Sequence, residues 1–579
     1  MIRDYFRVMI LDLAEGRGRI RNIDGRDQVA GGSGLAALLF GKYGLPEQPW
    51  DDPRQPIIFA IGPLTGYFPL MSKTVCAFKS PYHNQYAESH AGGRSALCLR
   101  FADLDALVIT GRARRPSAVV VGSRQMTVRD VHYLWGKDVM ATGKILRRMV
   151  GGSGHRSVLR IGPAGEACAA LAGINVDSYR HFGRLGGGAV MGAKNLKAVV
   201  IQGDGDFPLP GGKAYARLFA GIHEKLTGTD MMDKYHNLGT AANVAGLNAR
   251  RALPVRNLSA TGDPGMDRIS GEAFAEHTLL RNAACAGCPV GCIHIGFVRE
   301  KFMEPNQYLY RKVAYDYEPI FSLGSMLGIT DPFAILALLD HVEKLGLDAM
   351  GAGVALAWAT EALARGVVST KETVVPLAFG AQEAYLLALD HLAHATNDFY
   401  TALARGTLNA AEHYGGEAFA CVLGQEMAGY ATGEVFFTAQ ALGFRHSHLD
   451  SGGYGYDQQE NPRDAARAVA FLVADEKDRV FLTSMAACLF ARKVYSAELL
   501  GEALDVVGYG SLAGDMEKIA ARIQRLRWQT RLATGYDPEG VVIPRRFHRI
   551  STWKGPLDSA YLAELRHTYA GAIRNLAAG

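Results

Sequence analysis

The sequence lacks any long hydrophobic run. Its longest apolar stretch, around residues 349–360, is bracketed by Asp348 and Glu361 and falls well short of the roughly 18 residues that a membrane-spanning helix needs. The N-terminus, Met1-Ile-Arg-Asp-Tyr, has no apolar core of the kind found in signal peptides. We therefore expect a cytoplasmic protein without a membrane partner.

The chain also lacks an excess of charge and the two common phosphate-binding motifs. Its net charge is +5 over 579 residues, with lysine and arginine dispersed, so no nucleic-acid partner is expected. The glycine cluster at residues 186–192 fails as a P-loop because Lys194 comes one place too late. It fails as a dinucleotide fingerprint because Met191 stands where the third glycine belongs.

Cysteine is scarce, yet three of the eight cysteines crowd into Cys285-Ala-Gly-Cys288-Pro-Val-Gly-Cys292. In a reducing compartment, clustered cysteines hold metal more often than they form disulfides. The C-x2-C-x3-C spacing can bring three thiolates to one soft metal centre. A closed centre needs a fourth protein ligand, and the nearest downstream cysteines are Cys421 and Cys488.

Several interpretations of this triplet compete. A structural zinc site needs a second ligand pair, which is missing, although His294 could take part. A radical-SAM cluster has the reverse spacing, C-x3-C-x2-C, and three unliganded thiols this close together would be vulnerable to oxidation. An iron–sulfur cubane completed by a distant cysteine fits the spacing best.

Short extended runs dominate the first third of the chain, and helical patterns dominate the rest. The predicted strands cover residues 7–13, 57–61, 106–110, 118–121, 158–161 and 198–201. Glycine-rich turns between them favour a surface that holds a large polar cofactor. After a linker at residues 207–212, the predicted helices cover residues 331–345, 354–365, 462–475 and 486–504.

Several longer motifs follow one another along nearly the whole chain. They are Ile61-Gly-Pro-Leu-Thr-Gly66, Leu134-Trp-Gly-Lys137, Ile161-Gly-Pro-Ala-Gly-Glu166, residues 183–197, the cysteine triplet, Tyr317-Glu318 with residues 323–329, Leu345-Gly-Leu-Asp348, and Val542-Ile-Pro-Arg-Arg-Phe547. In number and order they resemble the aldehyde ferredoxin oxidoreductase family, whose members carry tungsten, sometimes molybdenum, on two pyranopterins beside a cubane cluster.

The resemblance implies an α+β fold with three domains. A β-rich pterin-binding domain would span residues 1–206, a helical domain with the cysteine triplet residues 207–410, and a second helical domain with the fourth cysteine residues 411–579. The implied ligands of a [4Fe-4S] cluster are Cys285, Cys288, Cys292 and Cys488. The remaining cysteines, Cys76, Cys98, Cys168 and Cys421, are expected to pack as small buried side chains.

The resemblance also implies which residues contact the pterins. Glycine turns match segments whose backbone N–H groups meet phosphate and ring edges. His90 and the carbonyl of Ala189 match positions that help hold a Mg²⁺ between the pterin phosphates, although the family typically has asparagine at the first of these. The implied cofactor-binding residues are Gly32, Gly34, Lys73, His90, Gly92, Gly93, Arg94, Arg184, Gly186, Gly187, Gly188, Ala189, Glu343, Gly346, Leu347, Asp348 and Thr483.

Three departures from the family pattern predict a divergent member with altered cofactor contacts. Lys73 stands where the family usually has an arginine, and lysine lacks the planar five-donor fork. Glu343-x-x-Gly346-Leu347-Asp348 keeps one pterin motif in conservative form. Thr483-Ser-Met-Ala486-Ala487-Cys488 has lost the acid and the Gly-Leu pair of the other.

Glu318 matches the family's catalytic carboxylate, and His446 best matches its histidine, with His448 as the alternative. A base that activates water and a donor to the carbonyl oxygen suit oxidation of an aldehyde to an acid. Electrons would pass through the cluster to ferredoxin or an iron–sulfur subunit, in a homodimer or a larger complex. The alternatives are a low-potential reductase of an aromatic acid or acyl-CoA thioester, and a non-catalytic electron-transfer subunit.

Overall fold

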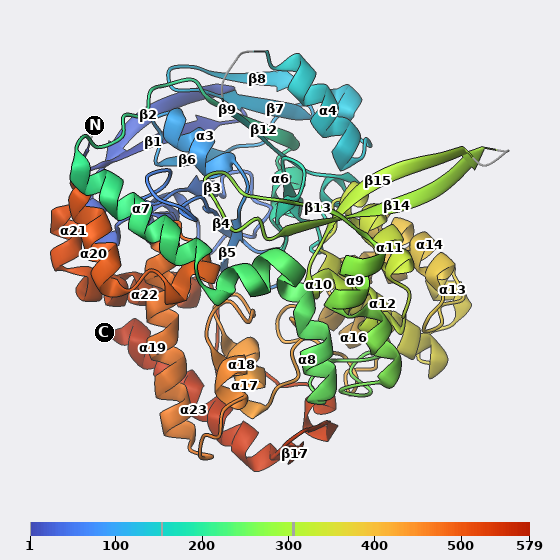
Figure 1. Cartoon of the computed structure of the whole chain (residues 1–579). Coiled ribbons are helices and arrows are strands. Elements are labelled where there is room, and N and C mark those ends of the chain that lie inside the picture. Colours follow the sequence, from blue (N-terminus) through green and yellow to red (C-terminus); the bar gives the residue numbers. More distant parts are fainter. Residues whose placement is uncertain (1, 152–154, 304–306) are drawn as a thin grey trace.

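Two six-stranded sheets lie in the N-terminal third of the computed structural model, which describes residues 2–151, 155–303 and 307–579 (Figure 1). The strand orders are β2-β1-β6-β3-β4-β5 and β11-β10-β9-β12-β7-β8, with parallel pairing only at β1–β6 and β7–β12 among the described residues. The first sheet contains β1 (Phe6–Asp12), β2 (Arg17–Ile23), β3 (Ile57–Ala60), β4 (Thr74–Lys79), β5 (Tyr86–Ala91) and β6 (Ala106–Thr110). The second contains β7 (Ser117–Val121), β8 (Met126–Asp130), β9 (His155–Arg160), β10 (Ile174–Val176), β11 (Arg180–Phe182) and β12 (Leu196–Gly203).

The alternation of side chains along the strands gives each sheet two apolar faces. In β3, Ile57 and Phe59 join the core between the two sheets, whereas Ile58 and Ala60 join the core formed with the helices. The rings of Phe59 and Phe182, one from each sheet, lie 5.7 Å apart. The first sheet is therefore covered on both sides: one face packs against the second sheet and the other against the helices.

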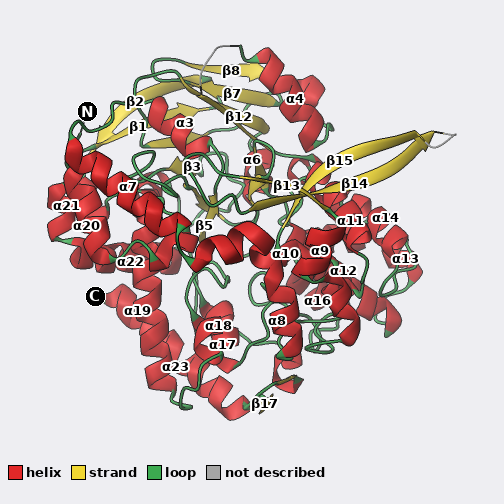
Figure 2. Ribbon diagram, viewed as in Figure 1, coloured by secondary structure: helices red, strands yellow, loops and turns green. Residues whose placement is uncertain are grey.

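Helices account for most of the remaining structure, which confirms the α+β class (Figure 2). The N-terminal third contains α1 (Arg26–Val29), α2 (Gly32–Tyr43), α3 (Ser95–Phe101), α4 (Val139–Met149), α5 (Pro163–Glu166) and α6 (Gly187–Ala193). Next come α7 (Lys213–Thr227), α8 (Asn243–Ala249), α9 (Gly271–His277), α10 (Tyr317–Leu323), α11 (Pro332–Leu345), α12 (Ala349–Ala364), α13 (Thr370–Thr373), α14 (Gln382–His394), α15 (Asp398–Ala404) and α16 (Thr407–Tyr414). The last are α17 (Glu434–Leu442), α18 (Gly453–Asp457), α19 (Ala465–Ser484), α20 (Ala497–Val506), α21 (Gly510–Gly514), α22 (Met516–Ala533) and α23 (Ser559–Ala578).

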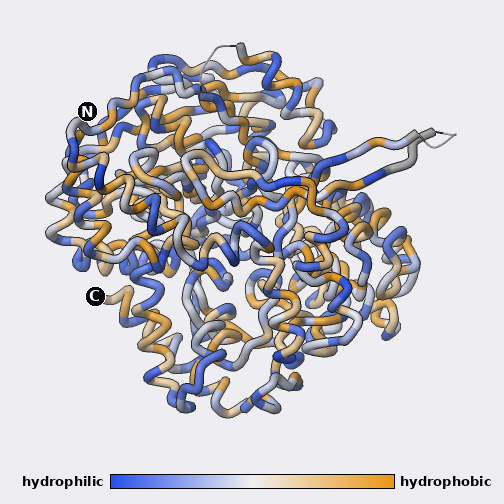
Figure 3. The backbone as a smooth tube through the Cα atoms, in the orientation of Figure 1, coloured by the Kyte–Doolittle hydropathy of each residue, from blue (hydrophilic) through white to orange (hydrophobic). Residues whose placement is uncertain are grey.

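A three-stranded antiparallel sheet interrupts the region that was expected to be helical. It contains β13 (Leu279–Ala283), β14 (Ile293–Met303) and β15 (Gln307–Tyr315), and a small two-stranded sheet, β16 (Ser551–Thr552) and β17 (Gly555–Pro556), lies near the C-terminus. The β14–β15 hairpin projects from the body of the molecule (Figure 1), and hydrophilic residues recur on both of its strands (Figure 3). The cysteine triplet occupies the connection from β13 to β14, so the pairing of these strands fixes both ends of that loop.

Other local expectations were met only in part. The strand predicted at residues 106–110 is β6, but β2, β4, β5, β8, β10 and β11 were not predicted. The glycine clusters at residues 31–34 and 183–189 are not simple turns, because they lead into helices α2 and α6. The helix predicted over residues 486–504 is interrupted, since only a short helical turn, η6 (Leu489–Lys493), precedes α20.

Within the described residues, no single helix is long and apolar enough to span a membrane. Only the pair Tyr317–Leu327 and Pro332–Leu345, bent by 111° at its break, reaches that length and composition together.

The end of α19 lies directly on the N-terminal sheet region. Lys73 N–H donates to the carbonyl of Ala486 at 2.9 Å, and Cys488 N–H donates to the carbonyl of Leu70 at 2.9 Å. A Cβ atom added to Gly32 would lie only 2.2 Å from the carbonyl oxygen of Thr483. This approach of two backbones, more than 400 positions apart in sequence, requires glycine at position 32.

Gly32→Ala should therefore lower stability by roughly 1–3 kcal/mol, since the new methyl group meets backbone and the residue has φ +42°. Gly41→Ala, in the same helix, is the matched control because its Cβ would meet nothing within 4 Å. Alanine there should stabilise the helix by up to about 1 kcal/mol. Calorimetric melting of both variants checks this, and equal melting temperatures would refute the close approach.

Candidate functional site

One cavity of about 800 Å³ lies where the N-terminal sheets, the cysteine loop and the C-terminal helices meet. It brings together most of the predicted site residues from distant parts of the chain. Those that line it are Lys73, His90, Gly92, Arg184, Cys285, Cys288, Cys292, Glu318, Glu343, Leu347, Asp348, Thr483 and Cys488.

The cysteine loop is folded by its own glycines and held against the N-terminal sheet. Gly287 and Gly291 have φ values of +65° and +63°, which lets the chain turn sharply between the thiols. Ala286 N–H donates to the carbonyl of Gly93 at 2.9 Å. A Cβ atom on Gly92 would lie 2.7 Å from the sulfur of Cys285. Only glycine at position 92 leaves room for that sulfur.

The four thiols lie close enough to influence one another's ionisation. Burial raises the pKa of Cys288 to about 12 and that of Cys292 to about 11, and the nearby Cys488 adds to both shifts. Burial also opposes ionisation of Cys285, but the positive charges of Arg180 and Lys73 bring its pKa below the usual value. Cationic neighbours therefore favour the thiolate form that a metal centre requires.

The spacing of these donors decides which metal centre they fit. No three His, Cys, Asp or Glu side chains within residues 2–151, 155–303 and 307–579 lie close enough to hold a single metal ion. In a cubane each of four thiolates binds a different iron. Four separate thiols on one cavity wall are the donor set that such a cluster needs.

A polar wall of the cavity surrounds the start of α12. Asp348 accepts hydrogen bonds from Met350 N–H at 3.2 Å and Gly351 N–H at 3.0 Å, and Arg184 Nε lies 3.6 Å from its carboxylate. Burial raises the pKa of Asp348 to about 6. Nearby, Glu343 contacts His181 Nε2 at 2.7 Å. This wall offers charged and polar groups suited to a large polar cofactor.

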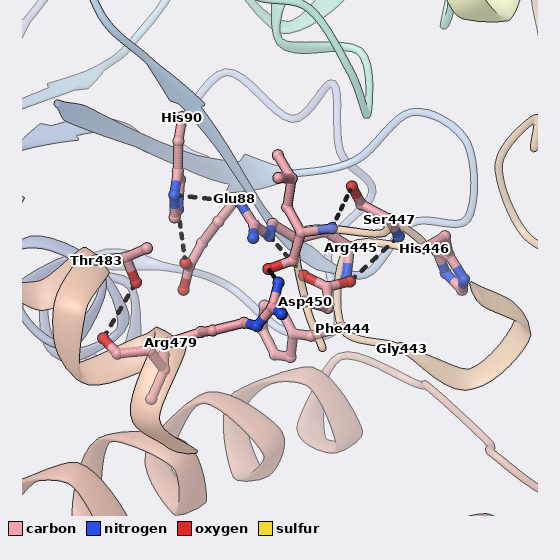
Figure 4. A network of polar contacts seen from close by, with 12 residues as sticks. Glu88, His90, Gly443, Phe444, Arg445, His446, Ser447, Asp450, Arg479 and Thr483 are labelled. Atoms are coloured by element: carbon pink, nitrogen blue, oxygen red, sulfur yellow. Dashed lines mark hydrogen bonds and ion pairs between the residues drawn. The ribbon is translucent and has the colours of Figure 1, made fainter. Parts of the chain in front are cut away.

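The side chain of His90 is only 10% exposed, and both of its ring nitrogens are engaged (Figure 4). Nε2 lies 3.2 Å from Glu88 Oε2, and Arg445 donates to Nδ1 at 3.1 Å. Burial lowers the pKa of His90 to about 4. With both nitrogens occupied, His90 has no free electron pair for a metal, so His90 does not fit the role in Mg²⁺ binding that the resemblance implied.

The remaining predicted cofactor residues do not line the cavity: Gly32, Gly34, Gly93, Arg94, Gly186, Gly187, Gly188, Ala189 and Gly346. Close packing explains several of these glycines. A Cβ atom would lie 2.3 Å from Pro81 at Gly186 and 2.4 Å from the carbonyl oxygen of Gly173 at Gly188. Gly346, with φ +74°, ends α11 against Gly162.

Glu318, in the first turn of α10, forms the acid–base part of the site. Tyr430 OH donates to Glu318 Oε1 at 3.0 Å, and His448 Nε2 lies 3.2 Å from the same oxygen. Burial, with the nearby Asp316, raises the pKa of Glu318 to about 8. Burial and the positive charge of Arg184 lower the pKa of His448 to about 3. At neutral pH the pair therefore holds one proton, mainly on the carboxyl group.

His446 lies elsewhere. Its Nε2 accepts a hydrogen bond from Arg531 at 2.7 Å, its Nδ1 lies 3.0 Å from the carbonyl of Gln440, and its side chain does not line the cavity. In Figure 4 the ring points away from His90 and Asp450. The structure thus pairs Glu318 with His448 and not with His446, which was the first choice from the sequence.

Several cavity residues carried no usable sequence motif: Arg180, Tyr430, Arg445 and Arg479. Arg180 begins strand β11, and Arg479 lies in helix α19. Tyr430 lies in a loop and Arg445 in a turn. Asp316 also lines the cavity. Its place directly before Tyr317-Glu318 was an available signal, as was the place of Arg445 directly before His446.

Comparison with known proteins gives a consistent result. The family model "Aldehyde ferredoxin oxidoreductase, N-terminal domain" matches residues 8–203, and "Aldehyde ferredoxin oxidoreductase, domains 2 & 3" matches residues 217–570. The tungsten-containing aldehyde ferredoxin oxidoreductase of Pyrococcus furiosus is 29% identical over 549 residues, covering 91% of this chain and 88% of the relative.

Two further similarities widen the range of related proteins. The WOR-like subunit of an aliphatic sulfonate oxidoreductase from Pyrococcus furiosus is 29% identical over 424 residues, covering 69% of this chain and 66% of the relative. A solved structure of the active-site complex BamBC of benzoyl coenzyme A reductase with 1,5-dienoyl-CoA matches with a TM-score of 0.80. At 18% identity, covering 98% of this chain and 95% of that one, this match shows a shared fold.

The ionisation of Glu318 can be measured directly. Infrared difference spectra between the wild type and Glu318→Gln should show a protonated carboxyl band at pH 7 that disappears as the pH rises through about 8. Tyr430→Phe removes a hydrogen bond that stabilises the carboxylate, so the band should persist to higher pH. Tyr400→Phe, which loses a hydrogen bond to Thr373 instead, is the control. A carboxylate already ionised at pH 6 would contradict this assignment.

Proposed function

We propose that this chain, which belongs to the aldehyde ferredoxin oxidoreductase family, is a tungsten–pterin oxidoreductase that oxidises an aldehyde to a carboxylic acid. Its electrons would pass through a [4Fe-4S] cluster to ferredoxin or an iron–sulfur partner subunit. The observation that carries the proposal is the shared cavity: the Glu318–His448 pair and the four cysteines line the same space.

The residues that would hold the two redox groups are separate sets on the cavity wall. Cys285, Cys288, Cys292 and Cys488 would hold the cluster. The polar wall around Arg184 and Asp348 would hold the pterins. Lys73 and Gly92 also line the cavity, next to Cys285. When bound, a tungsten bis-pterin supplies the two-electron chemistry that amino-acid side chains lack.

The side chains supply the proton transfers. Conversion of an aldehyde and water to an acid releases two electrons and two protons. Glu318 in its ionised form can accept a proton from the attacking water, and His448 Nε2, in contact with the same carboxyl oxygen, can share that proton. Tyr430 OH keeps the carboxylate in place. Tyr430 is buried and the side chains of Glu318 and His448 are only 16% and 13% exposed, which strengthens these interactions.

The direction of electron flow separates this proposal from its nearest alternative. A low-potential reductase of an aromatic acid or acyl-CoA thioester would use the same cavity, and the fold shared with the benzoyl-CoA reductase complex keeps that alternative open. A purely electron-transferring subunit is less well supported because it would need no buried Glu318–His448–Tyr430 arrangement.

Assembly with other chains is part of the proposal. One relative is described as a subunit and the solved neighbour as a complex. We therefore propose a homodimer or a complex with an iron–sulfur subunit, in the reducing cytoplasm where clustered thiols can hold a metal centre.

Replacement of the carboxylate tests the proposed chemistry. Glu318→Gln should lower kcat for aldehyde oxidation by roughly 10²- to 10⁴-fold, because an amide cannot accept the proton. Its tungsten and iron contents should stay at the wild-type level. The wild-type rate should rise with pH towards about 8, as Glu318 ionises. Anaerobic assays with a viologen acceptor measure both effects.

Glu412→Gln, on the exposed face of α16, is the matched control and should behave as wild type. Oxidation by Glu318→Gln at the wild-type rate would contradict the role of Glu318. A metal-loaded wild type that reduces an acyl-CoA thioester but oxidises no aldehyde would favour the reductase alternative.

A further inference from the structure

Three basic side chains at the outer part of the cavity have no carboxylate partner. Lys234, Arg250 and Arg492 all line the cavity, and none of them forms an ion pair within the described parts of the chain. Lys234 and Arg250 are exposed and Arg492 is half-buried, so they belong to the solvent-exposed part of the cavity lining, which we call its mouth. We refer to these three residues as the mouth cations.

The other arginine and lysine side chains of the cavity have a carboxylate or a thiol beside them. Arg445 contacts Asp450 at 2.7 Å, Arg479 contacts Asp475 at 2.5 Å, and Arg184 lies 3.6 Å from Asp348. Lys73 and Arg180 both act on the thiol of Cys285. Of the arginine and lysine side chains that line the cavity, the mouth cations are therefore those that neither form an ion pair among the described residues nor act on the thiol of Cys285.

Arg492 is oriented towards the catalytic side of the cavity. Its Nη1 donates to the carbonyl of Leu489 at 2.9 Å, and its Nη2 donates to Tyr454 OH at 3.3 Å. The rings of Tyr454 and Tyr430 lie 5.4 Å apart, and Tyr430 in turn bonds Glu318. Two aromatic rings thus separate Arg492 from Glu318. An extended substrate with one end at each group fits this arrangement.

The other two mouth cations are held by separate elements. Arg250, just after α8, donates to Oε1 of Gln458, just after α18, at 2.6 Å, so this bond joins the segments that follow these two helices. Lys234 belongs to a π-helical turn, η2 (Met232–Leu238), which His236 Nδ1 ties to the carbonyl of Val290 at 2.8 Å. π-Helical turns are uncommon and often occur at functional sites.

We propose that the substrate of this site carries an anionic group, a carboxylate or a phosphate, at the end remote from its reacting carbon, and that Arg492 and Arg250 bind that group. The inference rests on the proposed function, because it names the substrate class for the same cavity. Arginine offers paired donors for carboxylate and phosphate oxygens. The neutral partners of both side chains leave their positive charge uncompensated until such a group arrives.

Two aldehydes of equal chain length test the proposal in the metal-loaded enzyme. Succinic semialdehyde carries a carboxylate opposite its aldehyde, and butanal does not. Arg492→Gln should raise KM for succinic semialdehyde about tenfold to a hundredfold, the loss expected for one charge-assisted hydrogen bond. The KM for butanal should change less than twofold. Arg250→Gln should show the same selectivity with a smaller effect, and Arg492→Lys should recover part of the affinity.

Lys493→Gln is the matched control, because it also removes one positive charge from η6 but its side chain does not line the cavity. It should leave both KM values unchanged at the same ionic strength. An equal rise in KM for both aldehydes in Arg492→Gln, or no rise for either, would overturn the proposal. Loss of tungsten from Arg492→Gln would also overturn it, because the cation would then serve the cofactor.

A binding measurement keeps this inference separate from the proposed function. If the wild type oxidises neither aldehyde, the proposed function fails, and calorimetric titration with succinate decides about the mouth cations. Binding that weakens at least tenfold in Arg492→Gln but not in Lys493→Gln would support an anion site. Absent binding, or equal binding in all three proteins, would overturn it.

Discussion

The site depends on main-chain hydrogen bonds that fasten two distant segments to the N-terminal sheet region. The cysteine loop is held through Ala286 N–H and the carbonyl of Gly93, and the segment with the fourth cysteine through Cys488 N–H and the carbonyl of Leu70. Backbone bonds fix position more tightly than side-chain contacts, because they leave no rotamer freedom. The four thiols share one cavity wall as a result. Each close approach is possible only because a glycine, such as Gly32 or Gly92, faces it.

Charged groups of different kinds occupy different parts of the cavity wall. Near the cysteines, Lys73 and Arg180 favour thiolates. In the middle, burial and neighbouring charges move the pKa values of Glu318 and His448 in opposite directions, so that the pair keeps one transferable proton. At the mouth, Lys234, Arg250 and Arg492 form no ion pair within the part of the chain that the structure describes. The four cysteines, the Glu318–His448 pair and the mouth cations thus lie on the wall of one cavity.

The sequence was sufficient for features that local patterns determine. Strands predominate first and helices afterwards, and the cysteine triplet forms one loop. The family resemblance, not a local pattern, supplied Cys488 and Glu318, and both line the cavity together with Cys285, Cys288 and Cys292. Features that depend on contacts between distant segments could not be predicted. From the sequence alone, the missing side chain of Gly186 could leave space for a cofactor or for another residue. The structure shows that Pro81 fills that space. Whether His446 or His448 lies beside Glu318 depends on the turn after α17. In that turn His446 adopts φ +51° and its ring accepts a hydrogen bond from Arg531.

The central claim is that the cavity holds a tungsten or molybdenum bis-pterin next to one cubane cluster. Metal analysis of the anaerobically purified protein tests it most directly. The expected result is tungsten or molybdenum together with iron in a ratio of roughly one to four per chain. Iron without tungsten or molybdenum would contradict the claim, and the chain would then be an electron-transfer protein that has lost its pterin site.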